Sequence, residues 1–410
     1  MPVTFGLSIS RVDNEPRPAI WGDMSVIGLI GVAPDADAVA FPIDTPVLIR
    51  SADPVALTNL GEAGTLRDAL TLINAQLGDL QSSALVVVVR VTAGADAAAT
   101  MVNIVGDGIS TGVSAFLEAP ELLGYAPRLL AAPGFTGTIP SGGQGNPVVA
   151  ALAGIAPRLL AHAVVDGPNT TDDAAQTWRE SISSERIIPV EGGARIMDAT
   201  GTVVVVPASP AVLGIAVRRD FEFGGRPFHS WANQAVQGIV GPARPIPFSL
   251  TDPASEAQAL LAGNIGVIVR GEMGVDGGIA DGGFVYVGTD NAGADDLWRF
   301  YSVTRGRDYI HLMCLKTLRQ YLGRFNITGQ TIQAVLNTLN GALRDLKATG
   351  DILGYRVAFE PDLNSPEDLR TGKITVSFAA EEAPVLRRID VQSSRYRPAL
   401  EALVADLAAA

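Results

Sequence analysis

The most informative part of the chain begins with 297-LWRFYSVTRGRDYIHLMCLKTLRQYLGRF-325. Its residues 298–303 are rich in aromatic and β-branched side chains and predict a short strand. Residues 304–322 contain no proline and are apolar on more than one side, through Tyr309, Ile310, Leu312, Met313, Leu315, Leu318 and Tyr321. That pattern predicts a helix that is covered by protein on two faces.

A second helix is predicted by 328-TGQTIQAVLNTLNGALRDLKATG-350. Apolar residues recur at steps of three and four between Ile332 and Leu346, which is the signature of one buried stripe. The side chain of Thr328 or Thr331 would cap the first turn. Gly350 would end the helix where a left-handed residue is needed.

Two alternating strands follow the helices, 355-YRVAF-359 and 373-KITVSF-378. A loop over residues 361–371 joins them, so the strands are expected to pair with each other. The two helices and this hairpin together predict a C-terminal domain over residues 291–393.

Positive charge is concentrated in this part of an acidic protein. The whole chain has a formal net charge of -13, yet between residues 299 and 324 one acid, Asp308, stands against six basic residues: Arg299, Arg305, Arg307, Lys316, Arg319 and Arg324. A local surplus of cations predicts a face that meets an acidic partner. The alternative is an ordinary solvated helix face.

Composition limits the class of protein. With 410 residues there is room for two or three domains, and only 18% of residues are charged, which fits a subunit covered by its neighbours. No 18-residue apolar run and no signal-peptide layout are found, so the sequence predicts neither a membrane span nor export. The single cysteine, Cys314, excludes an internal disulfide and predicts a small core side chain.

The remainder of the chain alternates strands and helices. Residues 23–95 predict a small outer α/β domain, and residues 96–290 a central domain with an open, mostly parallel sheet and helices on both faces. The predicted strands are 25–33, 45–49, 84–91, 128–132, 162–166, 186–190, 202–206, 263–270 and 283–287, and the predicted helices are 65–77, 147–160, 174–183 and 208–220.

Both ends of the chain carry elements suited to an edge position. An N-terminal arm, residues 1–22, contains an alternating strand followed by two prolines; near the other end, 383–392 predicts a strand, and residues 394–410 form a C-terminal arm. Open strand edges recruit other chains, and head-to-tail contacts of this kind build rings or helical filaments. The predicted inter-subunit residues are Phe5, Leu7, Ile9, Leu386, Ile389, Val391 and Tyr396, and the predicted acceptor positions on the hairpin are Val357, Phe359, Ile374, Val376 and Phe378.

The sequence predicts no catalytic residue, no cofactor and no metal site. The three histidines are far apart and lack the spacing of zinc ligands. In 106-GDGISTG-112 the third glycine falls one residue late for a dinucleotide loop, and the preceding segment reads as well as a helix as it does as a strand. Asp166 ends a predicted strand, where an α/β enzyme could place a catalytic carboxylate, but a turn aspartate is the simpler interpretation.

Several collinear segments resemble contractile tail sheath proteins, those of small temperate contractile-tailed phages and of R-type pyocins. They include 25-SVIGLIG-31, 33-APDADA-38, 86-VVVVRV-91, 127-PRLLAAPG-134, and residues 369–396 near the end. The similarity extends over nearly the whole chain. It departs at 377-SFAA-380, where relatives have a tyrosine-rich strand, and in the alanine-rich tail.

The resemblance implies a structural subunit without enzymatic activity. Such a subunit would stack as hexameric rings around an inner tail tube, and contraction would drive the tube through the target cell envelope. The central domain would be doubly wound and subtilisin-like but non-catalytic, the C-terminal domain would face the tube, and the arms would link subunits by β-strand exchange. The cationic stretch is assigned to tube contact as a hypothesis.

Further partners implied by the resemblance are baseplate and tail terminator proteins, with no nucleic acid and no direct membrane insertion. The expected location is a virion tail assembled in the host bacterial cytoplasm. Two alternatives remain open at this point: an α/β enzyme with a site near Asp166 and Gly106, and a non-contractile tail or virion structural protein.

Overall fold

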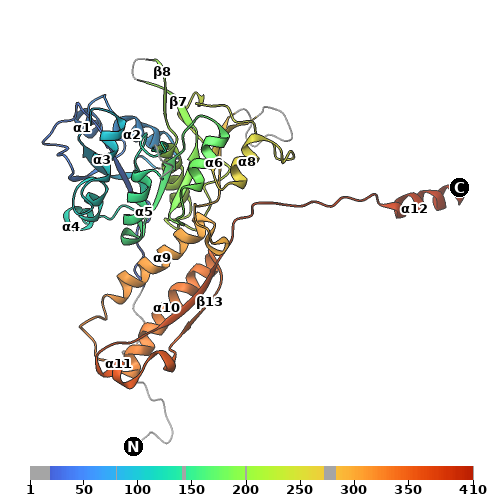
Figure 1. Cartoon of the computed structure of the whole chain (residues 1–410). Helices are drawn as coiled ribbons and strands as arrows, with labels where there is room; N and C mark the ends of the chain where they lie inside the picture. The colour runs from blue at the N-terminus through green and yellow to red at the C-terminus, as the bar shows by residue number, and fades with distance from the viewer. Residues whose placement is uncertain (1–18, 80, 141–144, 199–200, 272–282, 410) are drawn as a thin grey trace, which may run out of the picture.

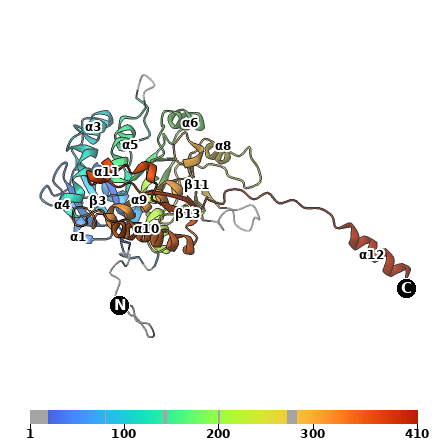
Figure 2. The ribbon, with the colours of Figure 1, turned by 90° about the horizontal axis from the view of Figure 1, so that it is seen from below.

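A computed structural model describes residues 19–79, 81–140, 145–198, 201–271 and 283–409. Figure 1 shows a body in which helices surround a sheet, a stalk that extends from the body, and a C-terminal arm that leaves near their junction. Figure 2, a view from below, shows the same arm reaching sideways, well away from both parts.

One nine-stranded sheet forms the centre of the body, in the order β2-β3-β1-β4-β5-β6-β11-β12-β9. Its six central strands are parallel, and the outer three are antiparallel to their neighbours. The strands are β1 (Ile27–Val32), β2 (Pro46–Arg50), β3 (Leu85–Val91), β4 (Leu129–Ala131), β5 (His162–Asp166), β6 (Ile187–Glu191), β9 (Gln234–Ala235), β11 (Gly266–Arg270) and β12 (Phe284–Val287). Runs such as 27-IGLIGV-32 are apolar without interruption because these strands are buried on both faces.

Helices cover both faces of this sheet, as predicted. One face packs on α2 (Leu66–Ala75) and α7 (Ser209–Glu222). The other packs on α3 (Ala97–Val105) and α5 (Pro147–Leu159). The smaller elements around them are α1 (Pro54–Leu60), η1 (Gly112–Leu117), α4 (Ala119–Leu123), α6 (Asp172–Glu180) and α8 (Glu256–Ala262).

The boundary predicted at residue 95 does not separate two sheets. Strand β1 pairs with β3 on one side and with β4 on the other, so residues 23–95 and 96–290 contribute to the same sheet. The apolar core is likewise shared, because Leu70 of α2 and Leu213 of α7 belong to one buried cluster. The order of elements along the sequence could not show this, since β1 takes its second neighbour from beyond residue 95.

The strand predicted over 202–206 exists but lies outside the parallel sheet. It is β8 (Val203–Pro207), and it pairs antiparallel with β7 (Gly193–Met197). With β10 (Gly241–Pro242) these strands form a separate three-stranded sheet. Figure 1 shows β7 and β8 projecting from the end of the body opposite to the stalk.

The stalk contains two long helices and a two-stranded sheet. Its elements are η2 (Asp296–Trp298), α9 (Tyr301–Leu318), α10 (Gly329–Thr349), β13 (Ile352–Ala358), η3 (Pro361–Leu363), α11 (Pro366–Arg370) and β14 (Ser377–Glu382). The second helix is confirmed with its caps: the backbone N–H of Thr331 donates to the Thr328 Oγ1 over 3.1 Å, and Gly350 is left-handed with φ 83°.

The strand predicted over 298–303 is wrong. Those residues form η2 and the first turn of α9, and Phe300 makes only a single bridge, with Asp290. The aromatic character of the segment instead serves the core, because Tyr301 is fully buried and stacks on Trp231 with 4.4 Å between ring centroids.

The strand predicted over 383–392 is not paired within the single chain. Residues 383–396 are extended without a sheet partner, and the tail forms α12 (Arg397–Ala408), which the sequence pattern had not indicated. A strand needs a neighbouring strand for its backbone hydrogen bonds, and this segment points away from its own body (Figure 1).

Candidate assembly surfaces and the joint at helix α9

Helix α9 joins the stalk to the body through charged side chains that point in different directions. Its first three turns are mostly buried, because the body covers one side and the C-terminal hairpin another. Arg305, Arg307 and Asp308 each contact a different element. We call Arg305 and Asp308, together with their partners Asp220 and Arg186, the α9 joint.

Arg305 lies in the protein interior with 0% exposure. Its guanidinium donates to both carboxylate oxygens of Asp220 on α7, over 3.0 and 2.6 Å, and to the carbonyl of Met24 over 3.2 Å. The same guanidinium stacks over the ring of Trp231 at 5.0 Å. Ser25 also donates to Asp220. This residue therefore does not belong to a solvated or tube-facing surface in this structure, contrary to the hypothesis from the sequence.

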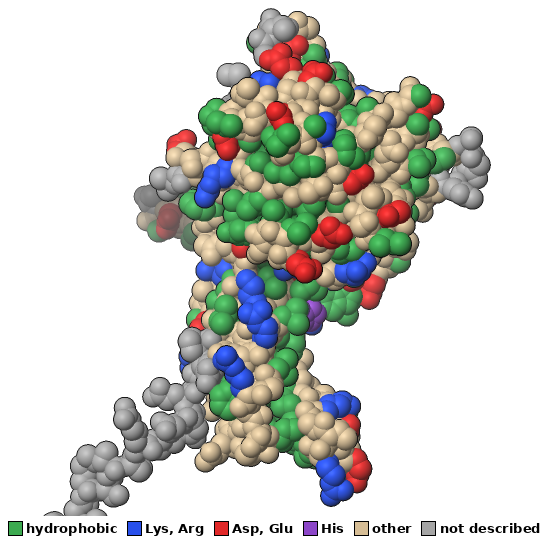
Figure 3. Space-filling view, turned by 90° about the vertical axis from the view of Figure 1, so that its left-hand side faces the viewer, with side chains coloured by type: hydrophobic (Ala, Val, Ile, Leu, Met, Phe, Trp, Pro, Cys, Tyr) green, Lys and Arg blue, Asp and Glu red, His purple; other side chains and the backbone are tan. Residues whose placement is uncertain are grey.

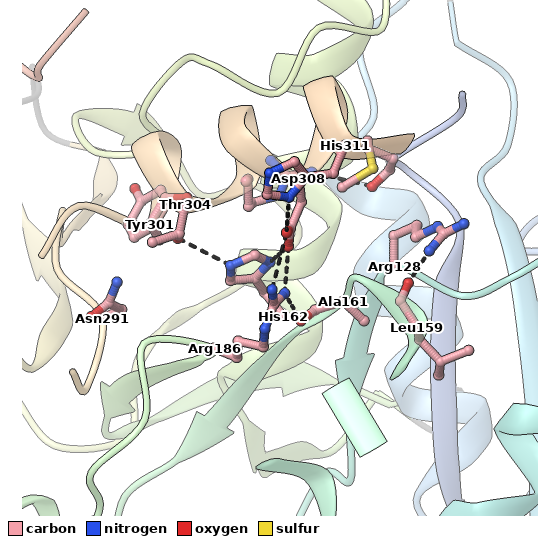
Figure 4. A network of polar contacts seen from close by, with 12 residues as sticks. Arg128, Leu159, Ala161, His162, Arg186, Asn291, Tyr301, Thr304, Asp308 and His311 are labelled. Carbon is pink, nitrogen blue, oxygen red and sulfur yellow. Dashed lines mark hydrogen bonds and ion pairs between the residues drawn. The ribbon is translucent and has the colours of Figure 1, made fainter. Parts of the chain in front are cut away.

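Asp308 makes the second half of the joint (Figure 4). Arg186, which precedes β6, donates to both of its oxygens, one of them over 3.0 Å. Burial alone would raise the pKa of Asp308, but hydrogen bonds from His311 and Arg186 outweigh it and hold that pKa well below the ordinary value. The carboxylate therefore stays charged, and the ion pair persists across the physiological pH range.

His162 faces the same joint from β5. Its Nε2 lies 3.0 Å from the Thr304 hydroxyl, and its Nδ1 lies 3.8 Å from Asp308. Burial lowers the pKa of His162 to about 3, and the attraction of Asp308 only partly offsets this. A neutral imidazole thus packs between the sheet and α9 (Figure 4), and it supplies polar contact without adding a second buried cation.

Arg307 connects α9 to the hairpin instead of to the body. It donates to both oxygens of Glu382 on β14, over 2.6 and 2.9 Å, and to the carbonyl of Ala380 over 2.7 Å. Its guanidinium also lies over the rings of Trp298 and Phe378. Arg307 is therefore committed to an internal contact as well.

In the structure the C-terminal arm begins right after β14, at residue 383, and not at residue 394 as predicted; it starts from a fixed point at the base of the stalk. Asp290 is buried and accepts contacts from two arginines: Arg299, over 3.1 Å, and Arg387 of the arm, over 2.8 Å. Arg387 also donates to the carbonyl of Leu261 over 3.3 Å. These contacts, which we call the arm clamp, set the direction in which the chain leaves the body.

Three of the six predicted cations remain exposed. Lys316, Arg319 and Arg324 lie at the end of α9 and just after it, and within the described part of the chain no ion pair is found for them. Leu315 and Leu322 are exposed among them. Figure 3 shows basic side chains spaced along this side of the stalk, interleaved with hydrophobic ones.

The predicted acceptor residues lie on or beside the hairpin. Val357 on β13 is opposite Phe378 on β14, and both are half-buried. Phe359 follows β13, whereas Ile374 and Val376 precede β14, so these three lie just outside the paired strands. Each strand of the hairpin has the other as its one partner in the described structure, which leaves two open edges.

The predicted residues of the C-terminal arm are all exposed, namely Leu386, Ile389, Val391 and Tyr396. Large apolar side chains in a row without a cover are unusual on a soluble surface and mark an interaction site. Helix α12 continues the pattern with Leu400, Leu403, Val404 and Leu407. The predicted N-terminal residues Phe5, Leu7 and Ile9 lie outside the described residues.

Asp166 has a structural role. Its carboxylate accepts hydrogen bonds from the backbone N–H and the hydroxyl of Ser209, over 2.7 and 2.6 Å, and so binds the start of α7. Burial raises its pKa to about 6, and the Ser209 contacts partly offset this. Burial likewise raises the pKa of Glu191, at the end of β6, to about 7, partly offset by Arg244.

The other features that bear on chemistry are turns and core positions. The loop 106–112 follows helix α3, not a strand, and Asp107 folds it by accepting three backbone N–H groups. No cluster of three or more metal-ligating side chains occurs among the described residues. Cys314 is half-buried. No helix among the described residues has the length and apolarity needed to cross a bilayer.

Sequence comparisons identify relatives along nearly the full length. A prophage major tail sheath protein of Pseudomonas aeruginosa (strain UCBPP-PA14) is 31% identical over 391 residues, which cover 94% of each chain. The tail sheath protein of Escherichia phage P2 is 24% identical, again over 94% of each chain. The major tail sheath protein of Serratia phage KSP20 is 28% identical over 89% of this chain and 88% of its own. No family profile matches.

Solved structures show the same fold. The helical sheath of the anti-feeding prophage in its contracted state has a TM-score of 0.68 at 17% identity, covering 97% of this chain and all of that one. The contracted sheath complex of an extracellular contractile injection system, PVC, has a TM-score of 0.69 at 14% identity, with 97% and 99% covered. Taken with the relatives above, these likenesses place the chain in the family of contractile tail sheath proteins, structural subunits of contractile tails and not enzymes.

Proposed function

We propose that this subunit polymerises as stacked hexameric rings around an inner tube, and that shortening of the stack drives the tube through a target cell envelope. The observation that carries the proposal is the C-terminal arm: a segment with a row of exposed apolar side chains, clamped at its root and directed away from its own body. A chain built in this way buries those side chains only in an assembly.

Strand exchange is the proposed mode of linkage. The hairpin β13–β14 has two open edges, and the extended segment 383–396 has unpaired backbone groups. When the extended segment adds as a strand to an open edge, the backbone hydrogen-bonding groups of the edge and of the segment pair with each other. The N-terminal strand would occupy the other edge. Because donor and acceptor lie at different places on one chain, the contact does not close on itself and continues from subunit to subunit.

The proposed tube-facing surface consists of Lys316, Arg319 and Arg324. Exposed ion pairs contribute roughly 0–1 kcal/mol each in solvent, so a small group of them can hold a tube collectively and release it pair by pair. Arg299, Arg305 and Arg307 are excluded from this surface because Asp290, Asp220 and Glu382 already engage them. Their role in the proposal is to keep the stalk fixed to the body.

A fixed stalk suits contraction. The α9 joint contains one fully buried ion pair, Arg305–Asp220, and one part-buried pair, Arg186–Asp308. Losing one partner of a fully buried pair costs roughly 3–5 kcal/mol. We therefore infer that body and stalk move together and that the arms accommodate the change between extended and contracted states. The extended state would be kinetically trapped until the baseplate triggers it.

The proposal has two further parts, the fold type of the central domain and the partners at the ends of the stack. The parallel strands of the body, with helices on both faces, support a doubly wound, subtilisin-like central domain that does not catalyse. The carboxylate of Asp166 binds Ser209, and no histidine of the described residues contacts it. The proposed partners beyond the tube are baseplate and tail terminator proteins, which would meet the two ends of the stack.

Electron microscopy of the purified full-length protein tests the assembly. Hollow cylinders with regular cross-striations are the expected result, because stacked rings repeat along the axis. Discrete particles of uniform size would contradict polymerisation, and smooth thin tubes would indicate a tube protein instead of a sheath. The same images with and without tube protein would show whether the extended form requires the tube.

A further inference from the structure

Helix α12 carries an apolar stripe that no other described part of the chain covers. Leu400, Leu403, Val404 and Leu407 follow the spacing i, i+3, i+4, i+7 and are each more than half exposed. Ala402 and Ala405 lie on the opposite side. A helix of 12 residues is marginal in water by itself and gains its stability from packing such a stripe.

A groove with both apolar and polar side chains in its lining lies at the root of the same arm. It has a volume of about 440 Å³, and its apolar lining includes Phe248, Leu250, Leu261 and Val287, with Leu386 of the arm on one side. Leu250 is 55% exposed, so the groove is open to solvent. The arm contributes Leu386 and Arg387 to this lining, and the arm clamp fixes Arg387 there.

The arm limits where α12 can dock. Nine residues lie between Arg387 and Arg397, and an extended chain reaches at most about 3.3–3.6 Å per residue. Figures 1 and 2 agree that the arm uses this length to carry α12 away from its own body. In this arrangement the helix lies clear of its own body, and the described residues leave both its apolar stripe and the groove uncovered.

We propose that α12 of one subunit docks in the groove of Phe248, Leu250, Leu261 and Val287 on a second copy of this chain. The helix is thus a second connection, separate from strand exchange, and it places the tail of each subunit beside the arm root of the next. One helix and one groove per chain give a head-to-tail series. This inference rests on the proposed sheath assembly and adds the contact partner of α12.

Disulfide crosslinking tests the contact directly. In a Cys314→Ser background, full-length protein carrying both Leu403→Cys and Leu250→Cys is oxidised under polymerising conditions and run on a non-reducing gel. A ladder with one additional subunit per step is expected. A mixture of the two single-cysteine proteins should give only dimers, because each chain then has one reactive site. An oxidised monomer from the double variant would show that the helix closes on its own groove, and would overturn the proposal.

A charge insertion gives an independent measurement. Leu403→Glu with Leu407→Glu should raise the concentration needed for polymerisation by about tenfold or more, because two charged carboxylates would have to enter an apolar contact. Ala402→Glu with Ala405→Glu is the matched control, with the same charge on the opposite side of the helix, and should leave that concentration within about twofold. Equal effects of the two pairs would contradict docking through the stripe.

The outcomes separate this contact from the sheath assembly as a whole. Striated cylinders that form without a crosslinked ladder would refute the α12 contact and leave the sheath proposal intact. A ladder without cylinders would support the contact and refute the ring stack. Cylinders together with a ladder are the expected result.

Discussion

Arg305 of α9 and Asp220 of α7 form an ion pair in which neither side chain is more than 1% exposed. Both guanidinium Nη atoms donate to the carboxylate, and the ring of Trp231 covers the cation. The stalk helix is therefore tied to a helix that packs on the central sheet. This relationship turns a residue that the sequence placed on a tube-facing surface into part of the interior.

Replacing Arg305 with alanine should destabilise the folded subunit by roughly 3–5 kcal/mol, because Asp220 would be left as an unpaired buried charge. Urea unfolding followed by tryptophan fluorescence measures the change. Arg319→Ala is the control; it removes an exposed cation and should shift the unfolding free energy by no more than about 0.5 kcal/mol. Similar midpoints for the two variants would refute the buried pair.

Neutralising Lys316, Arg319 and Arg324 to glutamine should leave the subunit folded and impair extended assembly around the tube. The remaining attraction would be weak, so the variant is expected to form sheath in the contracted state even when tube protein is present. The difference from wild type should diminish at high salt, where exposed charges are screened. Cosedimentation with tube protein and electron microscopy record both effects.

The matched control for that triple variant changes Arg50, Arg158 and Arg195 to glutamine, three exposed arginines of the body. Net charge changes equally in the two proteins. If the stalk variant still forms extended sheath, or if both variants lose extended assembly equally, then these residues do not contact the tube.

Two glycines on the stalk helices give opposite expectations for the same substitution. Alanine is favoured over glycine inside a helix by about 1 kcal/mol. At Gly341 of α10 an added Cβ meets no atom within 4 Å, so Gly341→Ala should stabilise by about that amount. At Gly306 of α9 it would lie 2.4 Å from the ring of Phe228, and overpacking costs about 1–3 kcal/mol. Gly306→Ala should therefore lower the melting temperature while Gly341→Ala raises it; a rise for both would show that Phe228 can move aside.

The pH dependence of stability should carry the signature of His162. Its pKa is about 3 in the folded protein, against an ordinary value of 6.5, because burial disfavours the charged ring. Between these values the unfolded chain binds the extra proton, so stability falls as pH falls below about 6.5, with a slope approaching about 1.4 kcal/mol per pH unit.

The measurement compares wild type with His162→Gln in urea titrations from pH 7.5 to 4.5. As the pH is lowered, the free energy of unfolding should fall more steeply for wild type than for His162→Gln, because only wild type contains the buried histidine. Glu191→Gln should show the opposite pH dependence. Because the pKa of Glu191 is raised to about 7, its contribution to the free energy of unfolding of wild type is lost as the pH rises from 4.5 to 7, and the variant lacks this loss. Parallel curves for His162→Gln and wild type would mean that His162 is already charged, or solvated, in the folded state.

Removing residues 1–18 should leave a soluble monomer, because one of the two strands proposed for exchange would be lost. Residue 19 is a suitable start, since the backbone N–H of Ile20 donates to Thr317 over 2.8 Å and this contact is kept. Size-exclusion chromatography with light scattering gives the mass. Sheath-like polymers from the shortened chain would refute the role of the N-terminal arm.

The sequence predicted those elements whose determinants lie within a single short segment. Helix α10 was found with both of its ends, because its apolar stripe, its Thr328 cap and the Gly350 stop are all contained in one segment. The strands of the parallel sheet were found for the same reason, as each is a short apolar run. The predicted residues of the C-terminal arm are exposed, whereas their role between subunits stays a prediction.

What the sequence could not supply depends on partners far along the chain. Tyr301 begins a helix because it stacks on Trp231, 70 residues earlier, and Arg305 is buried because Asp220 lies 85 residues earlier. No periodicity links those positions. The same limit explains the boundary at residue 95, which β1 crosses by pairing with β4. Helix α12 was missed because alanine on its polar side hides the contrast between its two faces.

One carboxylate, Asp290, anchors both the segment ahead of α9 and the first residues of the arm. In the proposed stack of rings, a pull exerted on the arm by an adjacent ring would therefore act on the base of the stalk without a slack linker in between. Movement of one ring would then be transmitted directly to the next, so contraction started at one end of such a stack would proceed ring by ring along it.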